Sequence, residues 1–276
     1  MKLACNYYIE TEELVKAKLI DIDYFKFPSL GFQAPILDDL DLYEEFLNEK
    51  KQIKPFIIHG LYPSPHNVCS PSFKEELRTD IIQRIIDQSE TPGISLHFDG
   101  AEEDASRDEI IEIAVDNLIF LKETFKEVEF IAIENVEKSR SPFLSDPEVI
   151  SKVVKRADIN FLLDISHAIW SSNYRKEEFF TYINKLPLDK VYEIHINGWA
   201  EKNDDLMCHI KIGDDGYKIL QYLLRRCSPE IITLEYGRHN DRIGIGCPVM
   251  KPDSINEKAK EEIIEQVSKL REIIRR

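Results

Sequence analysis

Short apolar segments alternate with longer amphipathic segments along the chain. The short segments are rich in Ile, Val, Phe and Tyr and are almost continuously apolar, as is typical of parallel strands covered by helices. They lie at residues 3–8, 19–25, 56–59, 94–98, 130–134, 161–164, 191–196 and 231–235. This pattern predicts eight buried strands.

Between these segments, apolar residues recur at spacings of three and four, which predicts helices. The predicted helices cover residues 40–50, 73–88, 107–125, 147–156, 176–184, 217–226 and 256–274, and the first connection, at 11–17, is short and weak. Ser145 or Asp146 is expected to cap the helix that begins at Pro147. Strands that are each followed by a helix predict an α/β fold, a single (β/α)8 TIM barrel over residues 1–276. A doubly wound open sheet is the alternative, but eight alternations favour the barrel.

Charge and composition narrow the classes of partner. The formal net charge is −15, and acidic residues occur along the whole chain, which argues against a surface that neutralises phosphates. No apolar run approaches the ~18 residues of a membrane span, and the N-terminus lacks the pattern of a signal peptide. The cysteines form no CxxC pair, which suits a reduced compartment. We therefore expect a cytoplasmic protein that binds neither nucleic acid nor a membrane.

The predicted strands end in residues that bind metals. In a (β/α)8 barrel, the chemistry lies at the carboxyl ends of the strands. At or just beyond these ends lie His59, His97, Glu134, Asp164, His167, His195, His209 and Glu235. A single buried histidine is usually structural, but so many ionisable groups buried without partners would cost several kcal/mol. Carboxylates and imidazoles are natural ligands of divalent cations, so this rim predicts a metal site.

The set is too large for the four to six ligands of one ion, which indicates more than one cation. Asp164 and His167 are one turn apart and are expected to face the same cavity. Asn135 directly follows Glu134 and is expected to orient it by a hydrogen bond. Iron, zinc and manganese all suit these ligand types, so the sequence alone does not choose among them.

From His59 to Glu235, the chain resembles the xylose isomerase-like TIM barrels. That superfamily includes sugar isomerases and epimerases, zinc-dependent apurinic endonucleases, and multinuclear non-heme iron-dependent oxidative enzymes that modify peptides. The stretches HGLYPSPHNVCSP and HIKIGDDG resemble endonuclease loops, whereas FLLDISHAIWSSNY, YEIHINGWAE and ITLEYG are more similar to the iron-dependent oxidative group. The chain departs from both groups. Met207 stands where the endonucleases have an Asp, and Ser166 and His167 stand where the oxidative group has Asn-Asn.

The resemblance implies a set of ligands for two or three divalent metal ions. His59 and His97 would bind one ion, and Glu134 would bridge it to a second. The second ion would also be held by Asp164, His195 and Glu235, and a third would belong to His167 and His209. Because Met207 replaces an expected Asp, the number of ions stays open. Glu134, Glu235 and His167 are the residues that we expect to be catalytic.

The resemblance favours an iron-dependent oxidative enzyme that acts on a small molecule or a peptide, whose thiol or other side chain binds an open metal position. One alternative is a metal-assisted phosphoester hydrolase. Another is a sugar isomerase or epimerase with Glu134 and Glu235 as its acid and base around one ion. A metal-binding barrel without catalysis is a fourth reading. The sequence does not define the substrate or the oligomeric state.

Overall fold

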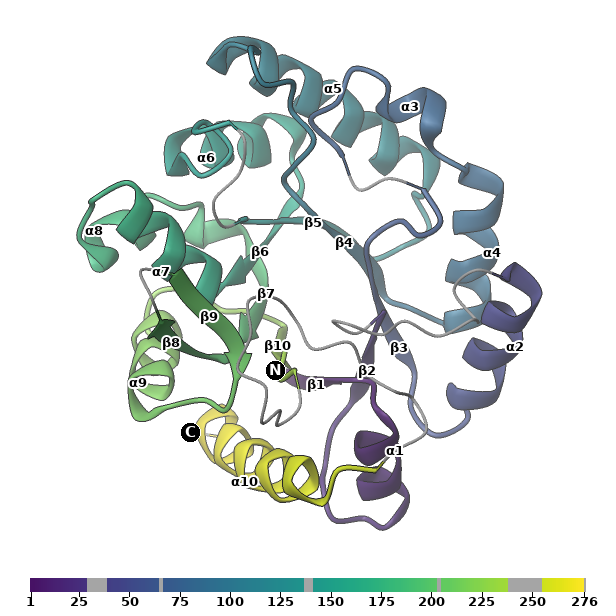
Figure 1. Cartoon of the computed structure of the whole chain (residues 1–276). Helices are drawn as coiled ribbons and strands as arrows, with labels where there is room; N and C mark the ends of the chain where they lie inside the picture. Colours follow the sequence, from purple (N-terminus) through teal and green to yellow (C-terminus); the bar gives the residue numbers. More distant parts are fainter. Residues whose placement is uncertain (29–38, 65–66, 137–140, 203–204, 238–254, 276) are drawn as a thin grey trace.

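The computed structural model describes residues 1–28, 39–64, 67–136, 141–202, 205–237 and 255–275, without the side chains of 201–207. Within these residues, eight parallel strands form a closed barrel (Figure 1). The strands are β1 (Lys2–Asn6), β2 (Tyr24–Phe27), β3 (Phe56–His59), β4 (Gly93–His97), β5 (Phe130–Glu134), β6 (Asn160–Asp164), β7 (Val191–Ile196) and β10 (Ile231–Leu234). Each strand pairs with its neighbours in sequence, and β10 closes the ring against β1. The predicted TIM barrel is therefore confirmed.

Helices surround the barrel and connect its strands (Figure 1). They are α1 (Ile9–Lys16), α2 (Leu40–Lys50), α3 (Phe73–Glu76), α4 (Thr79–Ser89), α5 (Arg107–Thr124), α6 (Pro147–Ala157), α7 (Ile165–Tyr174), α8 (Phe179–Ile183), the 3-10 helix η2 (Leu188–Lys190), α9 (Asp214–Leu223) and α10 (Glu257–Ile274). The predicted cap of α6 is Asp146, whose carboxylate accepts from the Glu148 N–H at 2.9 Å. No helix in the described ranges is both long and apolar enough to cross a bilayer.

Two predicted elements were wrong in their extent, and one helix was not predicted. The second strand begins at Tyr24 rather than at Leu19, which is 59% exposed. The predicted helix 73–88 is broken between α3 and α4, because the Arg78 N–H donates to the Ser64 hydroxyl instead of continuing the helix. Residues after Asp164 form helix α7, which was not predicted. The Asp164 carboxylate caps this helix by accepting from the His167 N–H in its first turn.

An antiparallel hairpin of β8 (Gly198–Lys202) and β9 (Asp205–Ile210) follows β7 and was also not predicted. In Figure 1 it lies beside α7 and α9, outside the ring of eight strands. The hairpin returns the chain to the barrel at His209. It therefore brings a residue of a long connection to the barrel mouth.

The barrel interior changes from apolar to polar along its strands. Near the amino ends, a small cluster fills it: Ala4, Ile57, Phe130, Ala132, Leu162 and Ile231. Alternate residues of a strand face the same side. The same alternation places His59, Glu134 and Asp164 two residues beyond this cluster, inside the mouth. The apolar layer thus forms the floor beneath the polar side chains.

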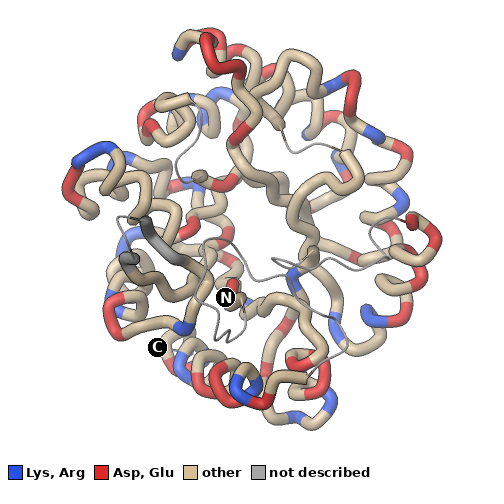
Figure 2. Tube along the Cα trace, in the orientation of Figure 1, with Lys and Arg blue, Asp and Glu red and all other residues tan. Residues whose placement is uncertain are grey.

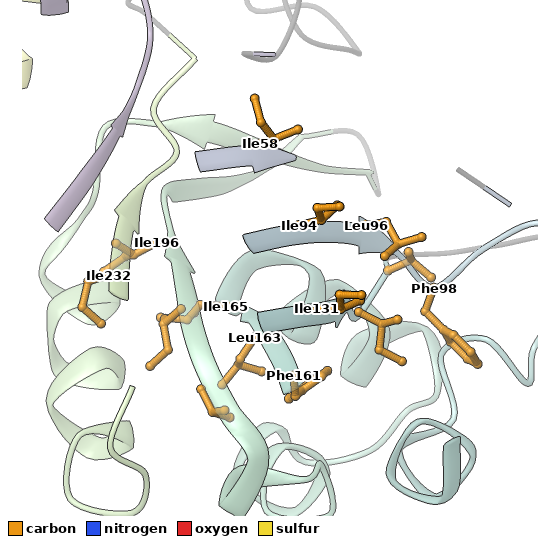
Figure 3. Packing of buried hydrophobic residues seen from close by; sticks show 14 of the residues in the cluster. Ile58, Ile94, Leu96, Phe98, Ile131, Phe161, Leu163, Ile165, Ile196 and Ile232 are labelled. Atoms are coloured by element: carbon orange, nitrogen blue, oxygen red, sulfur yellow. The ribbon is translucent and has the colours of Figure 1, made fainter. Parts of the chain in front are cut away.

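The outward faces of the strands pack against the helices. Ile94 and Leu96 of β4 and Phe161 and Leu163 of β6 belong to this larger core (Figure 3). Full burial of one such side chain contributes about 1.5–3 kcal/mol, so this layer stabilises the ring that carries the polar groups. Acidic and basic residues are interspersed along the outer helices (Figure 2).

Candidate metal centre

The structure brings all eight predicted ligands to the carboxyl ends of the strands. They form three groups: His59, His97 and Glu134; Glu134, Asp164, His195 and Glu235; and Asp164, His167 and His209. Within each group, one ligand atom per residue lies within 4.8 Å of all the others. Glu134 and Asp164 each belong to two groups, so the three groups form one continuous centre.

Distances within the centre fit ligands that surround a common ion. The Glu134 Oε2 atom lies 3.2 Å from the Nε2 atoms of both His59 and His97. The His195 Nδ1 atom lies 3.2 Å from Glu134 Oε1 and 3.4 Å from Glu235 Oε2. Ligand atoms about 2.1 Å from one ion are separated by about 3.0–3.4 Å.

Within the part of the chain that the structure describes, two of these carboxylate oxygens are buried without a hydrogen bond. Glu134 Oε2 and Glu235 Oε2 are shielded from solvent, and their histidine contacts lack hydrogen-bond geometry. A buried carboxylate oxygen without a partner is costly, whereas a bound cation would satisfy it. The oxygens and imidazole nitrogens that converge here therefore fit divalent metal ions.

Neighbouring groups orient His59 and His195. The Nδ1 atom of His59 is 2.9 Å from the Ser95 hydroxyl of β4, which leaves Nε2 directed at Glu134. The Nε2 atom of His195 is 3.1 Å from a carboxylate oxygen of Glu193, and Nδ1 faces the centre. A hydrogen bond to the second ring nitrogen fixes both the ring orientation and the tautomer of a metal-binding histidine.

Asp164 combines two roles at the junction of β6 and α7. Its Oδ1 atom accepts from the His167 N–H and from the Ser166 hydroxyl, both at 2.7 Å, and so caps α7. Asn135 does not hydrogen-bond to Glu134 as expected. The Asn135 side chain instead accepts from the backbone N–H of Asp164 and donates to the backbone C=O of Asp164. The backbone carbonyl oxygen of Asn135 lies 2.9 Å from His167 Nδ1. Asn135 thus joins β5 to the turn that carries two candidate ligands.

His209 reaches the centre from the β8–β9 hairpin. Its backbone is left-handed, with φ 62°, and its N–H donates to Asn197 Oδ1 at 3.0 Å. The Asn197 amide group also donates to Asp164 Oδ2, at 3.2 Å. A Cβ atom at Gly237 would come within 3.0 Å of the His209 carbonyl oxygen, so glycine permits this close approach. Among the described residues, Asp164 completes the third group with His167 and His209.

Lys26 and Glu193 were missed by the sequence analysis. Lys26, on β2, is 1% exposed and donates to Glu235 Oε1. Glu193 is fully buried and accepts from Thr233 Oγ1 at 2.5 Å as well as contacting His195. The available signal was the alternation of strand residues between the two faces of the barrel wall. Glu193 precedes His195 by two residues and therefore faces the same side. Lys26 is a charged residue within the otherwise apolar YFKF. The predicted end of that strand at Phe25 obscured Lys26.

The pKa values of the carboxyl groups depend on both burial and charge. Burial raises the pKa of Glu134, but the nearby histidines outweigh it and hold this pKa well below its usual range. Burial likewise opposes ionisation of Glu235, yet Lys26 and His195 lower its pKa. For Asp164, burial dominates and raises the pKa. Glu134 and Glu235 are therefore ionised and ready to bind cations at neutral pH.

The pKa values of His59 and His167 are shifted in opposite directions. Burial, reinforced by the charge of Lys26, holds the pKa of His59 well below its usual range, so its imidazole is neutral and can act as a ligand. Burial lowers the pKa of His167, but the charge of Asp164 outweighs it and raises this pKa. Protons therefore compete with cations more strongly at His167 than at His59.

Solved structures with this fold have names that refer to epimerases, isomerases and endonucleases. A D-tagatose 3-epimerase-like protein covers 100% of this chain and 99% of its own, with a TM-score of 0.62 and 16% identity. A xylose isomerase domain containing protein from Salmonella typhimurium LT2 has a TM-score of 0.65 and 14% identity, and covers 97% and 96% of the two chains. Endonuclease IV from Thermus thermophilus has a TM-score of 0.56 and 13% identity, and covers 99% and 100%. The fold is thus that of the xylose isomerase-like TIM barrels.

Fold and site together define a metal-dependent TIM-barrel enzyme. The family model described as RiPP precursor modification enzyme MbnB/TglH/ChrH matches residues 42–242, and the chain belongs to this family. All eight candidate ligands lie within the matched residues. The UPF0276 protein ACIAD0933 of Acinetobacter baylyi is 26% identical over 110 residues. This alignment spans only 38% of this chain and 38% of that relative.

Replacing Glu193 with glutamine is expected to weaken metal binding about 10–100-fold, the effect typical of losing a charged partner of a ligand. The amide keeps the size of the side chain but not the charge that holds His195 through Nε2. Metal affinity should be measured by competition with a chelator of known affinity. The Thr233→Val variant is the control, since it removes only one hydrogen bond to the same carboxylate. Equal affinities in wild type and Glu193→Gln would contradict this role.

Proposed function

We propose that this chain is an iron-dependent oxidative enzyme that modifies a peptide, with a substrate thiol bound at the metal centre. The observation that carries the proposal is the match to RiPP precursor modification enzymes over the residues that hold all three ligand groups. We further propose that residues 1–276 form one barrel domain. Its substrate would reach the centre through the mouth.

We assign the ions as follows. The first is bound by His59, His97 and Glu134, and the second by Glu134, Asp164, His195 and Glu235. The third is bound by Asp164, His167 and His209. Support comes from the ligand separations and the unbonded carboxylate oxygens described above. We propose two or three ions, with iron as the metal and zinc or manganese as the alternatives.

Exposure indicates where a substrate approaches. The side chain of His97 is 38% exposed, whereas those of His59 and Glu134 are 9% and 1% exposed. The first group is therefore the part of the centre that a peptide side chain meets first. Iron, when bound, supplies redox chemistry with dioxygen as the oxidant.

The protein's own residues hold the ligands and exclude water. Glu134, Glu235 and His167 are the residues that we propose take part in the reaction. The Glu134 Oε1 atom lies 3.5 Å from His167 Nδ1, and Glu235 Oε2 lies 3.4 Å from His209 Nε2. These three side chains line the space between the ligand groups, next to any molecule bound there.

The first test is the metal content of protein purified without oxygen and without added metal. We expect two or three irons per chain and an absorbance change when air is admitted. Short peptides that contain cysteine should then change in mass, and matched peptides with serine should not. Iron without any change in the cysteine peptides would contradict the peptide substrate.

Two other outcomes would replace the oxidative proposal. Two or three zinc ions without a response to air would favour metal-assisted phosphoester hydrolysis. One manganese ion per chain would favour a sugar isomerase that uses Glu134 and Glu235 as acid and base. A chain that binds no metal would contradict all three reactions.

A further inference from the structure

A lysine lies inside the barrel directly beneath the candidate metal centre. Lys26 projects inward from β2, is 1% exposed, and donates to Glu235 Oε1. Its charge also acts on Glu134 and Glu193. Lys26 lies outside residues 42–242, which match the family model. An ammonium group in this position is unusual because it competes with metal ions for the same carboxylates.

We propose that Lys26 is a positioning residue that makes Glu235 give only one oxygen to the second ion, and so keeps a metal position open for a small ligand. Lys26 donates to Oε1, and the other oxygen, Oε2, accepts no hydrogen bond from the described residues. That atom lies 3.4 Å from both His195 Nδ1 and His209 Nε2. Oε2 is thus the oxygen that contacts the two histidines, whereas Oε1 accepts from Lys26. The inference rests on the metal centre of the proposed function.

The ligand count shows why one oxygen matters. Glu134, Asp164, His195 and Glu235 each offer one atom to this group. An ion that takes about six ligands then keeps two positions for other molecules. A Glu235 carboxylate released from Lys26 can bind through both oxygens and fill one of them.

The positive charge of Lys26 also affects the affinity of the centre for metal ions. Glu134, Asp164, Glu193 and Glu235 are all buried in and around the centre, and Lys26 offsets one of their four negative charges. Removing this positive charge strengthens the attraction between the remaining carboxylates and a divalent cation. Lys26 therefore makes metal binding weaker but keeps the bound metal more open to other ligands.

The test compares wild type with Lys26→Met, which has similar length and no charge. We expect Lys26→Met to bind ferrous iron at least about tenfold more tightly in an anaerobic chelator competition. Nitric oxide is an uncharged probe of open iron positions, detected by electron paramagnetic resonance. At equal iron content, the variant should form at least about tenfold less of the nitric oxide adduct. Unchanged affinity together with an unchanged adduct would overturn the role of Lys26.

Two further variants separate charge from shape and from general stability. Lys26→Arg keeps a charged donor to Glu235, so its iron affinity and adduct should stay near those of wild type; results like those of Lys26→Met would overturn the proposal. Lys50→Met removes another lysine paired with a carboxylate, Glu12 at 3.3 Å, away from the centre, and should change neither quantity.

Folding and metal binding are checked separately. Lys26→Met leaves Glu235 without its lysine partner, so the metal-free variant should melt at a lower temperature, and added Mn²⁺ should raise this temperature more than in wild type. An equal rise in both proteins would count against the inference. Wild type that binds no metal would refute the metal centre itself, whereas metal binding unaffected by the Lys26 variants would refute only the role of Lys26.

Discussion

The Glu134→Ala variant is expected to lose at least one metal ion per chain and to lose more than about 100-fold in activity. Glu134 belongs to two of the three ligand groups, and its two oxygens face different histidines. The expected loss exceeds the 10–100-fold typical of residues that only support a ligand. Metal content should be measured by elemental analysis of protein purified without oxygen, together with the rate of peptide modification.

Two controls separate ligand loss from damage to the fold. Glu134→Gln keeps the volume of the side chain and should still lose metal, because a neutral amide oxygen binds cations less well than a carboxylate. Glu12→Gln changes another buried carboxylate, which Tyr7 and Lys16 hydrogen-bond outside the centre. It should retain the full metal content. A Glu134→Ala protein that also retained its full metal content would refute the shared-ligand role of Glu134.

The second large effect is expected at Asp164, where asparagine and alanine should act differently. Both variants remove a charged ligand from two groups and should lose metal and activity. Asparagine keeps the oxygen that caps α7, whereas alanine removes the cap and should cost about 1 kcal/mol of stability. Thermal unfolding in the presence of a chelator measures this difference without a contribution from the metal.

The pKa of Asp164 sharpens this prediction. Burial raises the pKa, which means that the metal-free fold stabilises the charged carboxylate less well than water does. Near neutral pH, the uncharged amide of the Asp164→Asn variant should therefore make the metal-free protein at least as stable as wild type. A metal-free Asp164→Asn protein that melts far below wild type would show that the negative charge stabilises the fold. Full metal content in that variant would instead remove Asp164 from the ligand set.

Local sequence determined the ring of strands and most of the candidate ligands at their carboxyl ends. Continuous apolar runs predict buried parallel strands, and a closed parallel barrel brings all their carboxyl ends to one face. The ends of β3, β4 and β5 could therefore be placed together from sequence alone, with His59, His97 and Glu134 as neighbours. Residues on consecutive strands meet because the backbone repeat is regular, so no long-range detail was needed.

Irregular connections were harder to predict, because their course depends on contacts between distant residues. The hairpin that delivers His209 is held by Asn197, which also binds Asp164 on another strand. No spacing in the sequence links those residues. For the same reason, Asp164 was not recognised as the third member of the group with His167 and His209.

The tertiary structure also decided the electrostatics of the centre. Sequence identified the carboxylates, but Lys26 and Glu235 are 209 positions apart and meet only because the barrel closes β1 between β2 and β10. Glu193 and Thr233 meet across β7 and β10 in the same way. Ligand identity thus follows from local pattern, whereas ligand orientation and net charge follow from packing among strands distant in sequence.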